Sequence, residues 1–218
     1  MNLSRCPLFD GIRHDELDAL MGCVGAREVS VRRNEAILRE GEPAREIGIL
    51  LSGRAQVVRT DYYGNRSIVV GIEAGELFGE TFACAAVDAL PVSVVATEAC
   101  SVLLINCQRL MTPCTQACGF HSRLIYNLLR IVASKNLIMH QKEMITSKRT
   151  TREKLMTYLL LQAKAAGNDR FSIPFDRQGL ADFLGVDRSG LSSELSKLKR
   201  EGILDYYKSD FRLLHVAQ

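Results

Sequence analysis

At 218 residues the chain is long enough for two small domains, and its 47% hydrophobic and 24% charged residues argue against a disordered protein. The net charge of +3 is unevenly placed, because residues 148–218 hold 13 basic and 9 acidic side chains whereas residues 1–147 hold 15 and 16. No apolar run approaches the roughly 20 residues that span a bilayer, and the first residues lack the apolar stretch of a signal peptide. We therefore expect a cytoplasmic protein whose basic C-terminal part favours nucleic acid.

The first half of the chain alternates between short apolar runs and turns. Residues 1–24 are expected to form a helical lead-in. From Arg27 to Cys107, β-type runs of even spacing indicate a jelly roll, with Tyr62 to Asn65 as an exposed hairpin tip. The expected strands are REVSVR, EAILRE, EIGILLSG, RAQVVRT, RSIVVGIE, VSVVAT and SVLLIN.

The segment from Gly75 to Phe82 interrupts the strand pattern. It predicts a short, glycine-flanked helix whose free N–H groups could hold an anion or a polar ligand, with Glu80 accepting hydrogen bonds from a ligand hydroxyl. A turn with a capping glutamate explains the same pattern, so both interpretations stay open.

A long helix is predicted from Pro113 to about Lys148. Apolar residues recur along it at spacings of four and three, which is typical of a coiled-coil dimer seam, and Asn136 would set the register of that seam. Packing of the same helix against its own roll is compatible with this, on another face. The predicted dimer seam consists of Ile125, Leu129, Val132, Asn136 and Met139.

The polar, basic run from Ser147 to Lys154 is expected to be a hinge between domains. Either Thr151 or Thr150, which has capping-box spacing to Glu153, can cap the helix that follows. The buried stripe of that helix is predicted as Leu155, Leu159 and Leu160, and residues 171–175 as a short strand.

The stretch from Arg177 to Gly202 has the pattern of a helix-turn-helix. Its first helix has an apolar face, Gly185 suits a left-handed turn, and Asp187 can cap the second helix. The polar face of the second helix is small and basic, which suits a groove of duplex DNA, although an ordinary helical hairpin has a similar pattern. Residues 203–207 and 212–216 would close a winged helix as a hairpin around residues 208–210. The buried stripes are Leu180, Ala181 and Leu184, then Leu191, Leu195 and Leu198; the polar face of the second helix carries Arg188, Ser189, Ser192, Ser193, Ser196 and Lys197.

Taken together, these elements resemble the Crp/Fnr family of bacterial transcription regulators. The motifs that carry the resemblance are Gly-Glu-Leu-Phe-Gly-Glu at 75–80, Pro-Val-Ser-Val-Val-Ala at 91–96, the hinge at 148–154, and residues 177–202. The resemblance implies an effector site between roll and long helix, dimerisation through that helix, and a recognition helix in the major groove. It implies pseudopalindromic DNA, a second copy of the chain and RNA polymerase as partners. The lack of a long apolar run predicts that no membrane is involved.

Several departures from the family pattern narrow these expectations. Members that bind cyclic AMP carry an Arg-Ser pair where this chain has Leu90-Pro91, and a buried phosphate without a cation is costly, which argues against cyclic AMP. Only Cys6 and Cys23 lie near the N-terminal end, too few for an iron–sulfur cluster of the oxygen-sensing members. A looser group, Cys107, Cys114 and Cys118, leaves a redox or metal role open.

We therefore predict an α+β protein: an N-terminal double-stranded β-helix, or jelly roll, over residues 1–112, a dimerisation helix over 113–147 and a C-terminal winged helix-turn-helix over 148–218. It would be a non-enzymatic regulator that activates or represses transcription under control of an unknown small ligand or redox signal, with no cofactor or metal. The alternatives are a constitutive regulator or a cupin-like metal enzyme; residues 27–107 contain no histidine, which argues against the latter.

The candidate DNA-binding residues are Arg149, Arg177, Gln178, Asp187, Arg188, Ser189, Ser192, Ser193 and Lys197, and the candidate effector pocket is Gly79, Glu80, Thr81, Leu90, Ser93 and Asn136.

Overall fold

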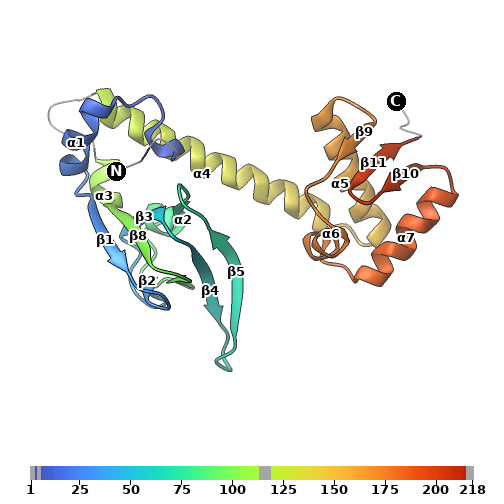
Figure 1. The fold of residues 1–218 in the computed structure, drawn as a ribbon, viewed down its shortest axis with the longest axis horizontal. Coiled ribbons are helices and arrows are strands. Elements are labelled where there is room, and N and C mark those ends of the chain that lie inside the picture. The colour runs from blue at the N-terminus through green and yellow to red at the C-terminus, as the bar shows by residue number, and fades with distance from the viewer. Residues whose placement is uncertain (1–2, 4–5, 113–118, 215–218) are drawn as a thin grey trace. The chain divides into compact units, whose positions relative to one another are not determined.

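A computed structural model describes residues 3, 6–112 and 119–214 (Figure 1). The chain forms two compact units, Met1–Lys135 and Asn136–Gln218, and the long helix α4, Gly119–Thr146, runs from the first into the second. The first unit is rich in β-strands and the second in helices. The predicted α+β organisation is confirmed.

The first unit is a roll of two antiparallel four-stranded sheets. Their strand orders are β1-β8-β3-β6 and β2-β7-β4-β5. The seven strands expected from the sequence are all present, and an eighth, β6, occupies part of the segment expected to be helical. The strands are β1 Arg27–Val31, β2 Ala36–Leu38, β3 Glu46–Ser52, β4 Ala55–Thr60, β5 Arg66–Ile72, β6 Leu77–Phe78, β7 Ser93–Ala96 and β8 Cys100–Asn106.

Apolar side chains fill the interior of the roll. Leu50 of β3 and Val102 of β8 are fully buried there, because alternate residues of a strand point to the same side of its sheet. The ring of Phe78 in β6 packs directly on Gly48 in β3, where an added Cβ would lie 2.1 Å from a ring carbon. This close packing requires glycine at position 48.

Helices cover one part of the roll and form a second apolar cluster with it. Leu124 and Leu128 of α4 are buried in this cluster, and the Asn127 side-chain amide donates hydrogen bonds to the carbonyls of Leu8 and Asp10, at 3.0 and 2.9 Å. The start of α4 is therefore fixed to the N-terminal lead-in of its own unit. The covering elements are the 3-10 helix η1 Pro7–Phe9, α1 His14–Cys23, α2 Glu80–Cys84, α3 Cys107–Met111 and the first part of α4.

The second unit is a winged helix. Three helices enclose one apolar cluster, and a three-stranded sheet of order β10-β11-β9 closes it. The predicted apolar faces of the helix-turn-helix are buried there. The elements are α5 Thr151–Ala166, β9 Arg170–Ser172, α6 Arg177–Leu184, α7 Arg188–Arg200, β10 Leu204–Tyr207 and β11 Asp210–Leu213.

Three details of the second unit differ from the sequence prediction. Leu160 is 42% exposed, and Tyr158 is buried in its place, because positions 155, 158 and 159 share a face of α5 whereas 160 turns away from it. The second wing strand begins at Asp210 rather than 212, since Asp210 already pairs with Tyr207. The short strand β9 covers 170–172 rather than 171–175. The predicted helix start at 113 and the strand end at 215–216 lie outside the described residues.

Candidate DNA-binding surface and sensor site

The turn between α6 and α7 forms as the sequence predicts. Gly185 has φ 61° and ψ 49°, the left-handed conformation that ends α6. The Asp187 carboxylate accepts hydrogen bonds from the Ser189 hydroxyl and from the backbone N–H of Gly190, the latter at 3.0 Å, so it caps α7. These bonds, the one from Ser189 first, hold the pKa of Asp187 below its ordinary value. Asp187 is thereby engaged as a cap.

The face of α7 that points away from the apolar cluster is small, polar and basic. Arg188, Ser189, Ser193 and Lys197 are exposed on it. Ser192 is half-buried, and its hydroxyl donates to the carbonyl of Arg188 at 3.0 Å, so the helix itself occupies this donor. Small side chains allow a close approach of the helix to a groove, while Arg188 at its first turn can reach base edges or phosphates.

The predicted DNA-binding residues of α6 have partners within the winged helix. The Arg177 guanidinium lies over the ring of Tyr206 in the wing, 5.0 Å from its centroid, and the Gln178 amide donates to Asp182 at 2.8 Å. Arg149 is exposed in the hinge between α4 and α5. The structure thus places the predicted residues on α6, α7 and the hinge of one unit, with their orientations partly fixed by neighbours.

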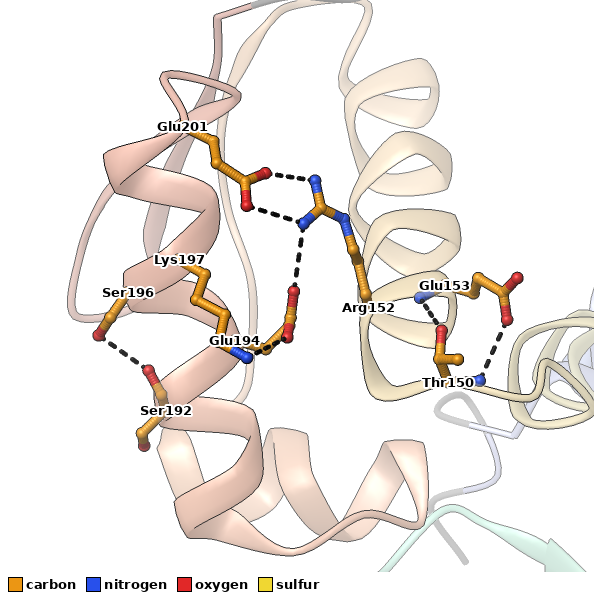
Figure 2. A network of polar contacts seen from close by, with 8 residues as sticks. All are labelled: Thr150, Arg152, Glu153, Ser192, Glu194, Ser196, Lys197 and Glu201. Carbon is orange, nitrogen blue, oxygen red and sulfur yellow. Dashed lines mark hydrogen bonds and ion pairs between the residues drawn. The ribbon is translucent and has the colours of Figure 1, made fainter.

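A network around Arg152 attaches α7 to α5 (Figure 2). Arg152 contacts Glu201 at the C-terminal cap of α7 through two hydrogen bonds, of 3.1 and 2.5 Å, and Glu194 within α7 at 3.5 Å. The bonds from Arg152 lower the pKa of Glu201. The network orients α7, and no local pattern reveals it because Arg152 lies more than 40 positions from its partners.

The helix that carries Arg152 is capped by Thr150. The Thr150 hydroxyl accepts from the Glu153 N–H at 3.1 Å, and the Glu153 carboxylate accepts from the Thr150 N–H at 3.1 Å (Figure 2). This settles the choice between Thr150 and Thr151 as the cap. The hinge therefore ends at Thr150 rather than at the predicted Lys154, because α5 begins at Thr151.

The centre of the predicted effector pocket is an internal ion pair. Glu80, only 3% exposed, accepts a hydrogen bond of 2.6 Å from the ammonium of Lys135 on α4, and Lys135 also donates to the Leu77 carbonyl at 3.1 Å. The Thr81 hydroxyl lies 3.4 Å from the same Glu80 oxygen. The carboxylate predicted to receive a ligand hydroxyl is therefore already satisfied by the protein. Lys135 was not among the predicted site residues, and its 55-residue separation from Glu80 left no local signal.

The other predicted pocket residues lie around the segment that follows β2. A Cβ on Gly79 would lie 2.9 Å from Leu38, the Leu90 N–H bonds to the Glu42 carbonyl, and the Ser93 hydroxyl accepts from the Glu40 N–H at 3.0 Å. Leu90 is buried. The side chain of Asn136 on α4 is exposed, and its place in an effector pocket remains a prediction.

The predicted dimer seam divides into two kinds of position. Ile125 and Val132 are half-buried and pack against the apolar cluster of the first unit. Leu129 and Met139 are 65% and 72% exposed, and Asn136 is exposed as well. Part of α4 therefore covers its own unit, as the sequence allowed, and another part presents apolar side chains to solvent.

The described residues form neither a cluster suited to a metal ion nor a helix suited to cross a membrane. Within 3, 6–112 and 119–214 no group of three or more His, Cys, Asp and Glu side chains is arranged to hold a metal ion. The ring nitrogens of His121 face the Leu110 carbonyl, at 2.8 Å, and the Cys23 sulfur, at 3.7 Å. Cys114 and Cys118 lie outside the described part of the chain. No described helix combines the length and apolar character needed to cross a membrane.

A roll with an internal polar site, a long helix and a capped, basic helix-turn-helix define the class of DNA-binding regulators with a sensor domain. Residues 28–115 match the cyclic nucleotide-binding domain family, and residues 153–218 match the Crp-like helix-turn-helix domain family. The transcriptional activator protein FnrA of Stutzerimonas stutzeri is 22% identical over 204 residues, which are 91% of this chain and 81% of that protein. The chain belongs to the Crp/Fnr family and is a transcription regulator of that type.

Solved structures share the fold. The catabolite activator protein of Thermus thermophilus superposes with a TM-score of 0.50 at 20% identity, covering 95% of this chain and 93% of that one. The c-di-GMP-responsive global regulator CLP of Xanthomonas campestris gives a TM-score of 0.53 at 17% identity, covering 94% and 100%. At these low identities the likeness shows the fold alone.

Proposed function

We propose that the protein acts as a homodimer that binds pseudopalindromic operators through α7, under control of a signal received at the roll. The observation that carries the proposal is the exposed basic face of α7, held by the Asp187 cap and by the Arg152 network. A signal that shifts α4 would change the separation of the two recognition helices, and so the population of DNA-binding dimers. Because the chain resembles other Crp/Fnr regulators, we also propose RNA polymerase as a partner.

Binding to duplex DNA should depend steeply on salt. Two winged helices that contact phosphates on half-sites about 34 Å apart release bound counterions, so affinity should fall on the order of 10³-fold between 50 and 200 mM salt. A fluorescence anisotropy titration of labelled promoter fragments at several salt concentrations measures this slope. Binding that is insensitive to salt, or absent from reduced and oxidised protein with every promoter fragment, would contradict the proposal.

A charge in the exposed part of α4 should dissociate the dimer. Leu129→Glu places a carboxylate in the predicted apolar seam, where it would be desolvated and repelled by its symmetry mate, so we expect a monomer by sedimentation or light scattering. Ser134→Glu, on an exposed position of the same helix outside the predicted seam, serves as the matched control and should stay dimeric. If the Leu129→Glu protein is still a dimer, the proposal that α4 forms the dimer interface is wrong.

A second candidate is a regulator whose roll takes no nucleotide. The interior of the roll is packed with its own side chains, Phe78 and Val94 among them. The Glu80 carboxylate already accepts a hydrogen bond from the Lys135 ammonium. Both observations support the expectation, drawn from Leu90-Pro91, that cyclic AMP is not the effector. Under this candidate the controlling signal acts elsewhere on the roll, or DNA binding is constitutive.

A further inference from the structure

Two cysteines of the roll unit lie side by side at the ends of two short helices. Cys84 is the last residue of α2 and Cys107 the first residue of α3. Their sulfur atoms are 3.9 Å apart, although the residues are separated by 23 positions. Cys84 is exposed, whereas Cys107 is buried in the apolar cluster beneath it. Peroxide from solvent can reach the first thiol, and the second lies directly behind it.

The pair is also chemically asymmetric. The Cys107 thiol donates a hydrogen bond to the Cys84 sulfur, which lowers the pKa of Cys84 to about 7 against the opposing effects of burial and of the nearby Glu80 carboxylate. The same hydrogen bond, together with burial, raises the pKa of Cys107. Burial raises the pKa of the Cys6 and Cys100 thiols. Because the thiolate is the reactive form, Cys84 should react with oxidants before these other thiols at neutral pH.

We propose that Cys84 and Cys107 form a redox-active dithiol, which a hydroperoxide converts into a disulfide between α2 and α3 and which thereby alters DNA binding. The Cys84 thiolate attacks one peroxide oxygen, the O–O bond breaks, and a sulfenic acid forms on Cys84 while hydroxide leaves. The Cys107 sulfur then attacks the Cys84 sulfur, the S–O bond breaks and the S–S bond forms. The oxygen leaves as water with the Cys107 proton. Two thiols lose two electrons and two protons, and one hydrogen peroxide becomes two waters.

The geometry allows the second step with a small local movement. A disulfide has an S–S length of about 2.05 Å, so the two sulfur atoms must approach by about 2 Å. Cys84 is exposed as the last residue of a five-residue helix, where rotation of its side chain can close most of this gap. Cys107 can remain in place, since its N–H is bonded to the Arg45 carbonyl at 3.0 Å.

The disulfide would act on the helix that holds Lys135. Glu80, which begins α2, lies one helical turn before Cys84 and accepts the 2.6 Å hydrogen bond from Lys135 of α4. Tying α2 to α3 therefore pulls on an element bonded to α4. This part of the inference rests on the proposed function, because it assumes that α4 governs the spacing of the recognition helices.

Mass spectrometry of the full-length protein tests the chemistry. With Cys114→Ser and Cys118→Ser as background, one to two equivalents of hydrogen peroxide should yield a peptide pair joined through Cys84 and Cys107, which dithiothreitol separates. Cys84→Ser should yield no such product. Cys107→Ser should stop at a sulfenic acid on Cys84, trapped by dimedone. A crosslink to any other cysteine, or between two chains, overturns the dithiol.

A second measurement needs no cysteine variant. In the reduced wild-type protein the rate of Cys84 alkylation by iodoacetamide should rise with a midpoint near pH 7, while Cys6 and Cys100 in the same digest remain slow. A Cys84 midpoint at the pH of an ordinary thiol, about 8.5, overturns the proposed asymmetry.

DNA titration separates the two halves of the proposal. Reduced and oxidised protein should differ in affinity for a promoter fragment by about fivefold or more, and dithiothreitol should restore the reduced value. A disulfide that leaves affinity unchanged overturns its regulatory role only. Loss of binding in the reduced protein would instead count against the proposed function.

Discussion

Replacement of Arg188 by alanine should weaken binding to the preferred operator about 10- to 100-fold while changing affinity for unrelated DNA much less. Arg188 is exposed at the first turn of α7, where a recognition helix meets base edges, and one bidentate contact to guanine contributes about 1–3 kcal/mol of discrimination. Lys199 of the same helix is less available, because it lies 2.6 Å from Asp205 in an ion pair. Competition titrations with operator and shuffled duplexes measure both affinities.

Arg200→Ala is the matched control for this experiment. Arg200 is an exposed arginine at the opposite end of the same helix, so its removal deletes the same charge far from the first turn. We expect a small loss of affinity that is equal for both duplexes. If Arg188→Ala also weakens both duplexes equally, Arg188 contacts phosphate, and the base-reading residues lie elsewhere on α7.

Replacement of Lys135 by methionine should lower the free energy of unfolding by about 1–3 kcal/mol, because it leaves the buried Glu80 carboxylate without its charged donor. We expect a loss in the lower part of this range, because the Lys135 side chain is 47% exposed. In the variant, water can therefore partly replace the lost ammonium as a hydrogen-bond donor to Glu80. Urea unfolding of the full-length protein at neutral pH measures the difference.

A double-mutant cycle isolates the pair. Glu80→Gln removes the charge but keeps a hydrogen-bonding group of the same size, so Glu80→Gln with Lys135→Met should recover most of the stability lost in Lys135→Met. Additive losses in the double variant would mean that the 2.6 Å contact contributes little. Such a result would also remove the connection between α2 and α4 through which we expect the disulfide to act.

The helix-turn-helix could be predicted closely from the sequence because each of its signals is local. The Asp187 cap reaches the Gly190 N–H three residues away, and the left-handed Gly185 ends α6 by itself. The buried stripe of α7 follows directly from helical periodicity. On α5 the same periodicity puts Tyr158 rather than Leu160 on the face of Leu155 and Leu159, and Tyr158 is the buried side chain.

The surroundings of Glu80 were predicted only in part. Local pattern drew attention to Glu80, but β6 forms within its segment because residues 77–78 pair with β3, an interaction that depends on the register of the sheet. The partner Lys135 and the Cys84–Cys107 pair could not be predicted, because both depend on which helices the roll brings together. The grouping of Cys107 with Cys114 and Cys118 overlooked Cys84, the thiol that lies beside it.

The sequence alone determined the class of this protein, since strand spacing, helix caps, apolar stripes and family motifs all arise from residues close together in the chain. Only the tertiary structure decided what lies around Glu80 in the roll unit: a lysine of α4 bonded to its carboxylate, and a thiol pair that begins one helical turn away. The physical reason is separation along the chain. Local interactions are encoded within a few residues, whereas a contact across 55 or 23 positions exists only after the sheets have set their register and the helices have packed.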